Sequence, residues 1–191
     1  MRALHLLCGL GALAACSGST TTGGVLPDGG SAGGPACASA NVTIQVNAAQ
    51  GSAAWCLGQP GGCASEWLSI RNGAGSTLLL SSFCITPCDT CQMPACPDIC
   101  RVASELPASG TSRTWDGNYF AQGTCGAATS CVRASCAPAG RYTASVCGFP
   151  NPSTDGGFGC ASADGTAKQT CVDVPFDYPS SGPVVATMPA L

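Results

Sequence analysis

Short runs of alternating apolar and polar residues recur along the chain from residue 37 onward. Alternation with a period of two is typical of β-strands that bury one face, whereas an amphipathic helix repeats about every 3.6 residues. This pattern predicts an all-β fold, an Ig-like (Greek-key) β-sandwich of about seven strands. The runs, separated by Gly, Pro and Asn residues that favour turns, cover residues 42–46, 67–71, 77–81, 100–103, 112–115, 141–147 and 171–174.

Three stretches that carry several cysteines interrupt the alternation, and we predict that they are long loops. They cover residues 56–63, 84–100 and 118–139, and each contains Gly or Pro. Such loops cost conformational entropy when they become ordered. We therefore expect cross-links to hold them.

The first 36 residues have a different composition. An apolar run from 3 to 12 follows Arg2, and it is shorter than the roughly 20 residues that a membrane-spanning helix needs. It is typical of a cleaved secretory signal. Residues 17–36 are mostly Gly, Ser, Thr and Pro, which predicts a flexible tether. We expect a signal peptide at 1–15, a tether at 16–36 and a Cys-rich β-sandwich domain at 37–191.

The motif Leu13-Ala14-Ala15-Cys16 resembles the lipobox of bacterial lipoproteins. The resemblance implies that Cys16 becomes the first mature residue and carries the lipid, with acyl chains such as palmitate. Ser17 resembles an outer-membrane address, while the face of the membrane stays open. An ordinary secretory signal with a chance cysteine is the alternative, and both interpretations imply export.

Charge and histidine content narrow the range of functions. Charged residues make up 9% of the chain, against about 25% in ordinary globular proteins. The net charge of −3 offers no basic surface for nucleic acid. The single histidine, His5, lies in the predicted signal peptide, so no Ser-His-Asp or Cys-His site is available afterwards. We therefore expect that the protein is not an enzyme.

Cysteine is the other unusual feature of the composition, with 16 residues. Cys8 leaves with the signal peptide and Cys16 is the lipidation candidate, so an even number remains in an exported chain. This favours a disulfide-rich fold, whose connectivity the sequence does not reveal. The disulfide candidates are Cys37, Cys56, Cys63, Cys84, Cys88, Cys91, Cys96, Cys100, Cys125, Cys131, Cys136, Cys147, Cys160 and Cys171.

The cysteines between residues 84 and 100 also admit two chemical interpretations. Thiolates bind zinc or iron–sulfur clusters, but these spacings match neither ferredoxins nor a zinc ribbon. Cys88 and Cys91 have the spacing of a redox motif, but no helix is predicted to begin beside them. Structural disulfides are favoured, and we expect no metal and no cofactor apart from the covalent lipid on Cys16.

Tryptophans and aspartates are further candidates for binding residues. Trp67 and Trp115 lie in alternating runs and are expected in the core, while Trp55 is the better candidate for exposure on a sugar-binding surface. Asp116, Asp173 and Asp177 are expected in turns rather than in a calcium site or a carboxylate pair.

A second resemblance concerns the fold. Trp115-Asp116-Gly117 and the Pro-Ala-Gly-Arg-Tyr stretch at 138–142 resemble the W-(D/N)-G…P-x-G-x-Y pattern of bacterial Ig-like sandwich domains. The pattern occurs in FlgD-type Ig-like domains and in the intracellular proteinase inhibitor family. The resemblance implies that Trp-Asp-Gly closes a hairpin and that Gly-x-Tyr begins a long strand. The chain departs from the pattern by a Cys-rich insertion between the two halves.

These features predict a lipid-anchored cell-envelope protein, an outer-membrane lipoprotein, that acts as a non-catalytic binding or structural module. The expected partners are the membrane, through the lipid, and an envelope protein or polysaccharide, with the specific ligand unidentified. The alternative is an inhibitor of extracellular proteases, in which the loop at 84–100 presents Met93-Pro94-Ala95. A rigid loop loses little entropy on docking.

Overall fold

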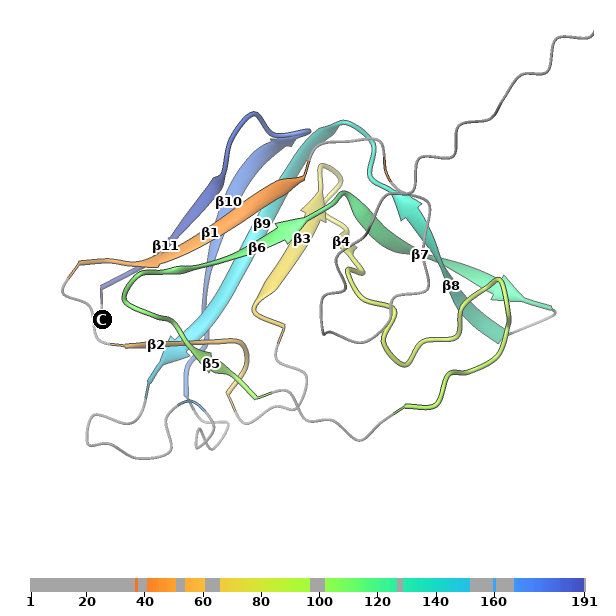
Figure 1. Ribbon diagram of the computed structural model, residues 1–191, viewed down its shortest axis with the longest axis horizontal. Coiled ribbons are helices and arrows are strands. Elements are labelled where there is room, and N and C mark those ends of the chain that lie inside the picture. Colours follow the sequence, from red (N-terminus) through yellow and green to blue (C-terminus); the bar gives the residue numbers. More distant parts are fainter. Residues whose placement is uncertain are drawn as a thin grey trace, which may run out of the picture. The chain divides into compact units, whose positions relative to one another are not determined.

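The computed structural model describes residues 37, 41–50, 54–60, 66–96, 102–126, 129–151, 160 and 167–190. All of them belong to one compact unit, 31–191, and the predicted signal peptide, lipobox and tether lie outside the described residues. The fold is all-β and disulfide-rich, as predicted (Figure 1). None of the described residues forms a helix long and apolar enough to cross a membrane. The strands are β1 (Val42–Ala48), β2 (Trp55–Leu57), β3 (Leu68–Asn72), β4 (Thr77–Leu78), β5 (Ser104–Glu105), β6 (Thr111–Trp115), β7 (Asn118–Cys125), β8 (Thr129–Cys136), β9 (Gly140–Pro150), β10 (Thr170–Tyr178) and β11 (Val184–Met188).

Two sheets form the sandwich, and one strand organises each of them. In the three-stranded sheet, β1 lies between β11, to which it is parallel, and β6, to which it is antiparallel. In the six-stranded sheet, the long strand β9 pairs with β10 on one side and with β3 and β2 on the other. The short strand β4 pairs with β3, and the short strand β5 pairs with β2. Figure 1 shows β1 and β6 crossing in front of β9.

The core lies between the inner faces of the two sheets, where the alternation of the sequence places apolar side chains. Strand β1 buries Val42, Ile44 and Val46, and β9 buries Ala144 and Val146. The residues between them face outward. A shift of the register by one residue would turn every apolar side chain of a strand to water, so the pattern specifies the pairing strongly.

Aromatic rings close one end of this core. The Trp115 ring centroid lies 5.5 Å from that of Tyr142, 6.2 Å from Phe176 and 4.8 Å from Tyr178. The Tyr142 hydroxyl donates a 2.8 Å hydrogen bond to the carbonyl oxygen of Pro138, and burial raises the pKa of this tyrosine. The hydroxyl of Tyr142, near the start of the long strand β9, thus bonds to the backbone four residues upstream, an arrangement similar to the tyrosine corner of Ig-like sandwiches.

The prediction of a long loop at 118–139 was wrong, because most of this stretch forms the β7–β8 hairpin. Eight residue pairs join the strands, from Asn118 opposite Cys136 to Cys125 opposite Thr129. Gly126 adopts a φ of 56° just after β7, a conformation that glycine tolerates best. The loop prediction assumed that the cysteines serve only to cross-link loops, whereas Cys131 occupies a fully buried position on strand β8.

Other strand boundaries also differ from the predictions. The run at 77–81 forms a strand only at Thr77–Leu78, and Leu79 forms an isolated bridge with Phe120. The short strand expected at 100–103 instead lies at Ser104–Glu105, with residues 100 and 101 outside the described ranges. Strands β2 and β11 were not predicted. Strand β2 is buried at all three positions, so it shows no alternation. Val185 places an apolar side chain on the outer face of β11 and hides the alternation there.

The tryptophan and aspartate predictions can be compared with the fold. Trp115 is buried in the core and Trp67 packs against the core at a half-buried position, as expected. Trp55 is also buried, with 1% of its surface exposed, so the prediction that it is the better candidate for exposure was wrong. Its indole N–H donates to the carbonyl of Pro189 across 3.1 Å. Asp173 and Asp177 lie within β10, not in turns. Asp173 falls inside the run predicted as a strand at 171–174, and β10 extends beyond that run to Tyr178, which places Asp177 in the strand as well.

Candidate functional site

A disulfide-held lobe, made of the β7–β8 hairpin and residues 79–96, carries the candidate site. Backbone hydrogen bonds attach the segment to both strands of the hairpin. The amide of Phe120 donates to Leu79 across 2.8 Å, the amide of Cys88 donates to Val132 across 2.9 Å, and the amide of Val132 donates to Thr86 across 2.9 Å. The segment therefore covers the outer edges of β7 and β8, which isolated hairpins leave open.

Three disulfides strengthen this attachment. Cys88 is bonded to Cys131 on β8, Cys91 is bonded to Cys125 at the end of β7, and Cys84 is bonded to Cys96 within the segment itself. Gly123 permits one of the bridges, because a Cβ atom there would lie 2.9 Å from Sγ of Cys88. A hairpin alone is marginally stable in water, and each disulfide typically contributes about 2–4 kcal/mol.

The remaining bridges lie in the sandwich and at its junction with the lobe. Together with the three bridges of the lobe, these bridges pair twelve of the cysteines predicted to form disulfides, which confirms that the fold is disulfide-rich. Cys63 and Cys100 lie outside the described residues. The three further pairs are Cys37–Cys136, Cys56–Cys160 and Cys147–Cys171.

The pairing bears on the redox and metal interpretations. Cys88 and Cys91 are bonded to different partners, so they do not form the bridge of a redox motif. In the part of the chain that the structure describes, no group of three His, Cys, Asp or Glu residues is arranged to hold a metal ion.

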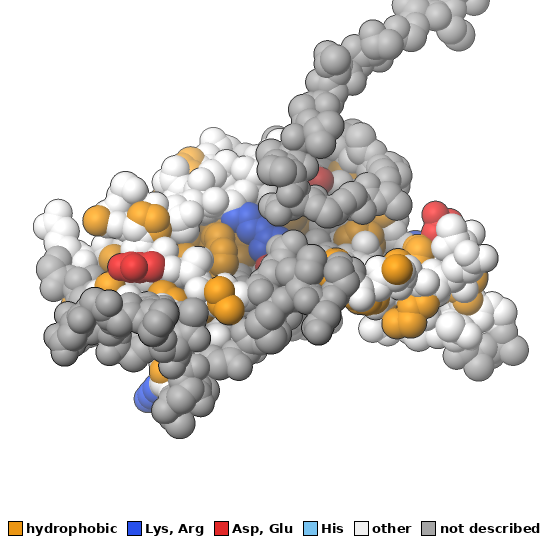
Figure 2. Space-filling view, turned by 60° about the horizontal axis from the view of Figure 1, so that its bottom comes forward, with side chains coloured by type: hydrophobic (Ala, Val, Ile, Leu, Met, Phe, Trp, Pro, Cys, Tyr) orange, Lys and Arg blue, Asp and Glu red, His pale blue; other side chains and the backbone are white. Residues whose placement is uncertain are grey.

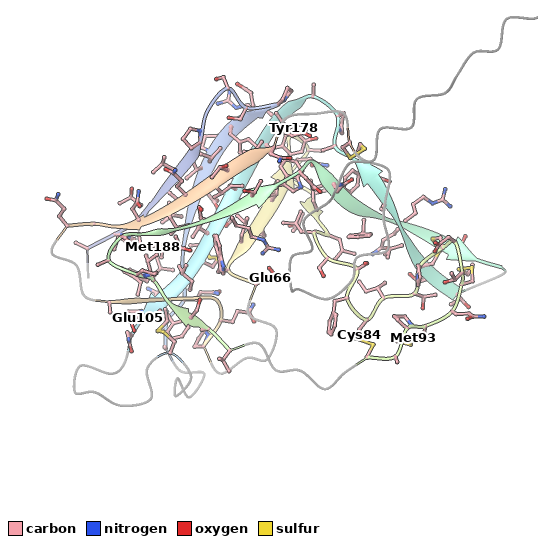
Figure 3. All side chains as sticks on the ribbon, in the orientation of Figure 1. Glu66, Cys84, Met93, Glu105, Tyr178 and Met188 are labelled. Atoms are coloured by element: carbon pink, nitrogen blue, oxygen red, sulfur yellow. A yellow bond between two sulfur atoms is a disulfide. The ribbon has the colours of Figure 1, made fainter. Side chains whose placement is uncertain are left out.

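Residues 91–96 of the lobe are all exposed, and we refer to them as the 91–96 segment. Met93 at its centre has 72% of its surface exposed, and Phe83 nearby in the chain has 55%. Figure 3 shows Cys84 and Met93 outside the hairpin, and Figure 2 shows hydrophobic side chains gathered on the lobe at the right. Both cysteines that end the segment are bonded, Cys91 to Cys125 and Cys96 to Cys84.

The backbone of the lobe holds an uncommon conformation at two of its cysteines. Cys84 has a φ of 58° and Cys91 a φ of 54°, in the left-handed region that residues other than glycine rarely adopt. Such residues persist where the surrounding structure over-determines them, and they cluster at functional sites. Here a disulfide at each cysteine and a 2.9 Å bond from the amide of Cys91 to Pro87 hold the conformation.

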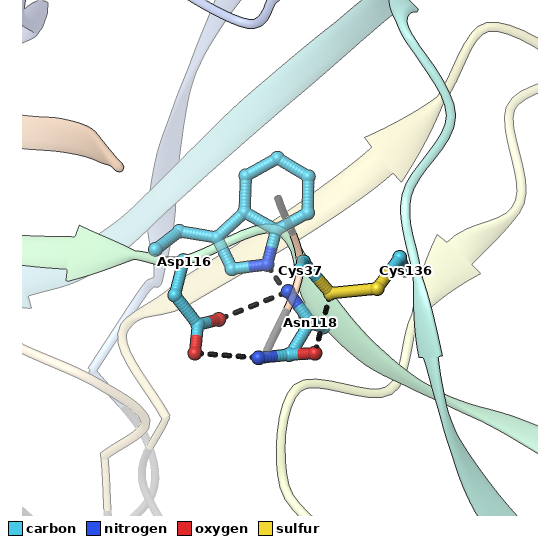
Figure 4. The surroundings of a disulfide bond; sticks show 5 residues. Cys37, Asp116, Asn118 and Cys136 are labelled. Atoms are coloured by element: carbon cyan, nitrogen blue, oxygen red, sulfur yellow. Dashed lines mark hydrogen bonds between the residues drawn. A yellow bond between two sulfur atoms is a disulfide. The ribbon is translucent and has the colours of Figure 1, made fainter. Parts of the chain in front are cut away.

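A corner joins the lobe to the sandwich at Trp115-Asp116-Gly117 (Figure 4). The hairpin implied by the Ig-like resemblance is not formed here, since β6 pairs with β1 and β7 pairs with β8. The Asp116 carboxylate instead accepts bonds of 2.9 and 2.7 Å from the amide and side chain of Asn118. Gly117 has a positive φ, 79°, a conformation that glycine tolerates best. The turn prediction for Asp116 is thus confirmed, but the chain changes sheets at the turn.

Asn118 also connects the corner to its neighbours. The indole N–H of Trp115 donates to the Asn118 carbonyl across 2.8 Å. The Asn118 Oδ1 atom lies 2.7 Å from Sγ of Cys37, which is bonded to Cys136 and has no hydrogen to donate. The corner therefore connects the lobe to a residue of the core, Trp115, and lies beside the Cys37–Cys136 bridge.

The outer faces of the two sheets differ in charge. The face of β3, β9 and β10 carries Arg71, Arg141, Asp173 and Asp177, and Arg71 forms an ion pair with Asp173. A hydrogen bond from Ser145, followed by the interaction with Arg71, lowers the pKa of Asp173. Positive and negative groups balance on this face, which leaves no site selective for one sign of charge.

The outer face of β1, β6 and β11 carries only neutral side chains. Its outward positions hold Thr43, Gln45 and Asn47 on β1, with Ser and Thr residues on β6 and Val185 and Thr187 on β11. Beside it, a depression with a volume of ≈ 390 Å³ is lined by Asn41, Thr43, Gln45, Ser180, Ser181, Gly182 and Pro183. The sequence analysis did not identify this face. In the sequence, this face corresponds to uncharged residues at alternate positions of three strands. It can be recognised only when these three strands are known to be neighbours.

Met93-Pro94-Ala95 could be selected from the sequence, whereas Phe83, which follows Ser81 and Ser82 directly, was not selected. Comparison of the chain with protein-family models, curated proteins and solved structures finds no match.

Proposed function

We propose that the protein is a lipid-anchored, non-catalytic binding module of the cell envelope and that the 91–96 segment contacts its partner. The observation that carries the proposal is the exposure of Met93, 72%, between two cysteines that are both bonded to other parts of the lobe. The anchor rests on the lipobox-like motif that ends at Cys16. Six disulfides among the described residues suit an oxidising compartment outside the cytoplasm.

The energetics of docking favour this segment over other exposed surfaces. Full burial of a methionine side chain contributes about 1.5–3 kcal/mol. A flexible segment would lose about 0.5–1.5 kcal/mol for each side chain that binding immobilises, and prior ordering reduces this cost. The disulfides and backbone bonds of the lobe order the backbone on both sides of Met93 before any partner arrives.

Site-specific cross-linking tests the proposal. A photoreactive residue is placed at position 93 or, as a control, at Val102, which is also apolar and has 55% of its surface exposed. We expect one discrete protein adduct from position 93 in intact cells, and none from position 102. Excess wild-type protein should suppress it, whereas excess Met93→Asp protein should not. Equal adducts from both positions, or none from either, would contradict the proposal.

A second candidate function, inhibition of extracellular proteases, is favoured by the same exposed and cross-linked segment. An inhibitor must present an exposed peptide to the substrate groove of the protease, and the 91–96 segment is exposed and belongs to none of the strands of the described sheets. Activity of chymotrypsin-like, elastase-like and subtilisin-like proteases is titrated with the oxidised protein. Inhibition that reaches completion at one-to-one stoichiometry and that Met93→Asp weakens at least tenfold would support this function. Digestion of the protein without inhibition would exclude it for these proteases.

A further inference from the structure

We propose that the outer face of β1, with the depression beside it, is a second binding site, and that its ligand is a neutral polysaccharide. The site is separate from the 91–96 segment, so it does not depend on the function proposed for the lobe. It is built from β1 and from the turn between β10 and β11, with Thr43 and Gln45 on the strand and Ser180 to Pro183 on the turn.

The polar groups of this site are available to a ligand. In the described ranges, the side chains of Asn41, Thr43 and Gln45 form no hydrogen bond with another residue. The turn is fixed by Ser180, whose hydroxyl donates to the carbonyl of Gly182 and accepts from its amide. The turn, held in this way, lines the same depression as the side chains of Asn41, Thr43 and Gln45.

Strand pairing extends the same chemistry across the sheet. Thr43 lies opposite Thr114, and Gln45 lies between Ser112 and Val185. Neighbouring strands are about 4.8 Å apart, and outward residues repeat about every 6.7 Å along a strand. The face therefore offers hydroxyl and amide groups at regular intervals in two directions, as an extended chain of sugar hydroxyls requires.

Charge decides between the chemical classes of ligand. Each of the seven residues that line the depression is neutral. An anionic polymer would need Arg or Lys here, and a cationic one would need Asp or Glu, because a charged group that loses water without a partner is strongly disfavoured. Hydroxyl and amide groups exchange hydrogen bonds with a neutral polyol at little cost.

Affinity electrophoresis with the oxidised full chain tests the proposal. The gels contain dextran, soluble starch, mannan or β-1,3-glucan as neutral probes, and alginate or polygalacturonate as anionic probes. We expect at least one neutral polysaccharide to retard the protein, with retardation unchanged between about 50 and 500 mM salt, because no ion pairs are involved. The anionic polymers should not retard it.

Variants locate the site. Thr43→Ala combined with Gln45→Ala should weaken binding at least tenfold, and Thr114→Glu should weaken it further by placing a charge opposite Thr43. Arg141→Gln, on the outer face of the other sheet, and Met93→Asp, in the lobe, should bind as the wild type does. Because each alanine replaces an outward side chain, thermal unfolding of the variants should match that of the wild type.

Three results would overturn the proposal. They are the absence of retardation by every neutral polymer, retardation that the double alanine variant retains, and retardation that rises with the charge of the polymer. Loss of binding in Met93→Asp would instead place the glycan on the lobe, and would contradict the separation of the two sites. A failure of the glycan experiment leaves the cross-linking result at position 93 unaffected, so the two proposals fail independently.

Discussion

Trp115→Ala is the substitution with the largest expected effect on the stability of the sandwich. Only 5% of the surface of Trp115 is exposed, and truncation of a buried aromatic to alanine typically costs about 3–5 kcal/mol. Three aromatic rings with centroids 4.8–6.2 Å away would border the resulting cavity. The carbonyl of Asn118 would also lose its indole donor, which costs about 1 kcal/mol or more. We expect a loss of about 4–5 kcal/mol, at the upper end of the range.

The assay is guanidinium unfolding of the oxidised protein, followed by near-ultraviolet circular dichroism. Disulfides restrain the unfolded chain and preserve the yield of damaged variants, so expression level is a poor substitute. Trp115→Phe keeps a ring and should lose about 1–2 kcal/mol, mainly through the hydrogen bond. Trp67→Ala, at a half-buried position beside the core, should lose less than Trp115→Ala. A loss below about 1 kcal/mol for Trp115→Ala, with an unchanged denaturant slope, would refute the assigned role of Trp115.

Three further predictions concern the ion pair, the lobe and the anchor. The pKa of Asp173 is lowered in the folded protein, so its ionised form adds stability above the ordinary pKa of 3.8, and this stability is lost as the pH falls through the lowered pKa. Asp173→Asn should therefore make the unfolding free energy depend less on pH in the acid range. The change should be less than about 1 kcal/mol, because the ion pair with Arg71 is exposed. An unchanged pH dependence would contradict this. Gly123→Ala should destabilise the protein by about 1–3 kcal/mol in denaturant unfolding, because its Cβ would crowd Sγ of Cys88, and a neutral effect would show that the bridge can shift. Cys16→Ser should release the protein from the membrane fraction or leave it unprocessed, and unaltered fractionation would contradict lipidation.

Strong alternation made several strands predictable from the sequence. The runs at 42–46 and 141–147 correspond to β1 and β9, where every second residue is buried against the opposite sheet over several positions. The prediction succeeded there because each run has one polar and one apolar face. The burial of Trp115, which lies in one of the alternating runs, followed from the same pattern.

The remainder depends on pairings between distant segments. Nothing local indicates that Cys91 reaches Cys125 while Cys88 reaches Cys131, since neighbouring cysteines could exchange partners at little change in loop length. Asp116-Gly117 favours a tight turn, but the local sequence does not reveal which strand β7 pairs with after the turn. It could pair with β6 or, as observed, with β8, while β6 pairs with β1. The same reasoning applies to the candidate sites. Exposure of Met93 could be suggested from its disulfide-bounded loop, whereas the neutral face requires β1, β6 and β11 to be adjacent.

Mass spectrometry of the unreduced protein purified from the envelope tests the account most directly, because one peptide map reports both the anchor and the cross-links of the lobe. We expect an acylated N-terminal peptide that begins at Cys16. We also expect disulfide-linked peptides that join Cys84 to Cys96, Cys88 to Cys131 and Cys91 to Cys125. A Cys88–Cys91 bridge, free thiols in the 84–100 region, or an N-terminal peptide without acyl mass would contradict the claim of a lipid-anchored module with a disulfide-held binding segment.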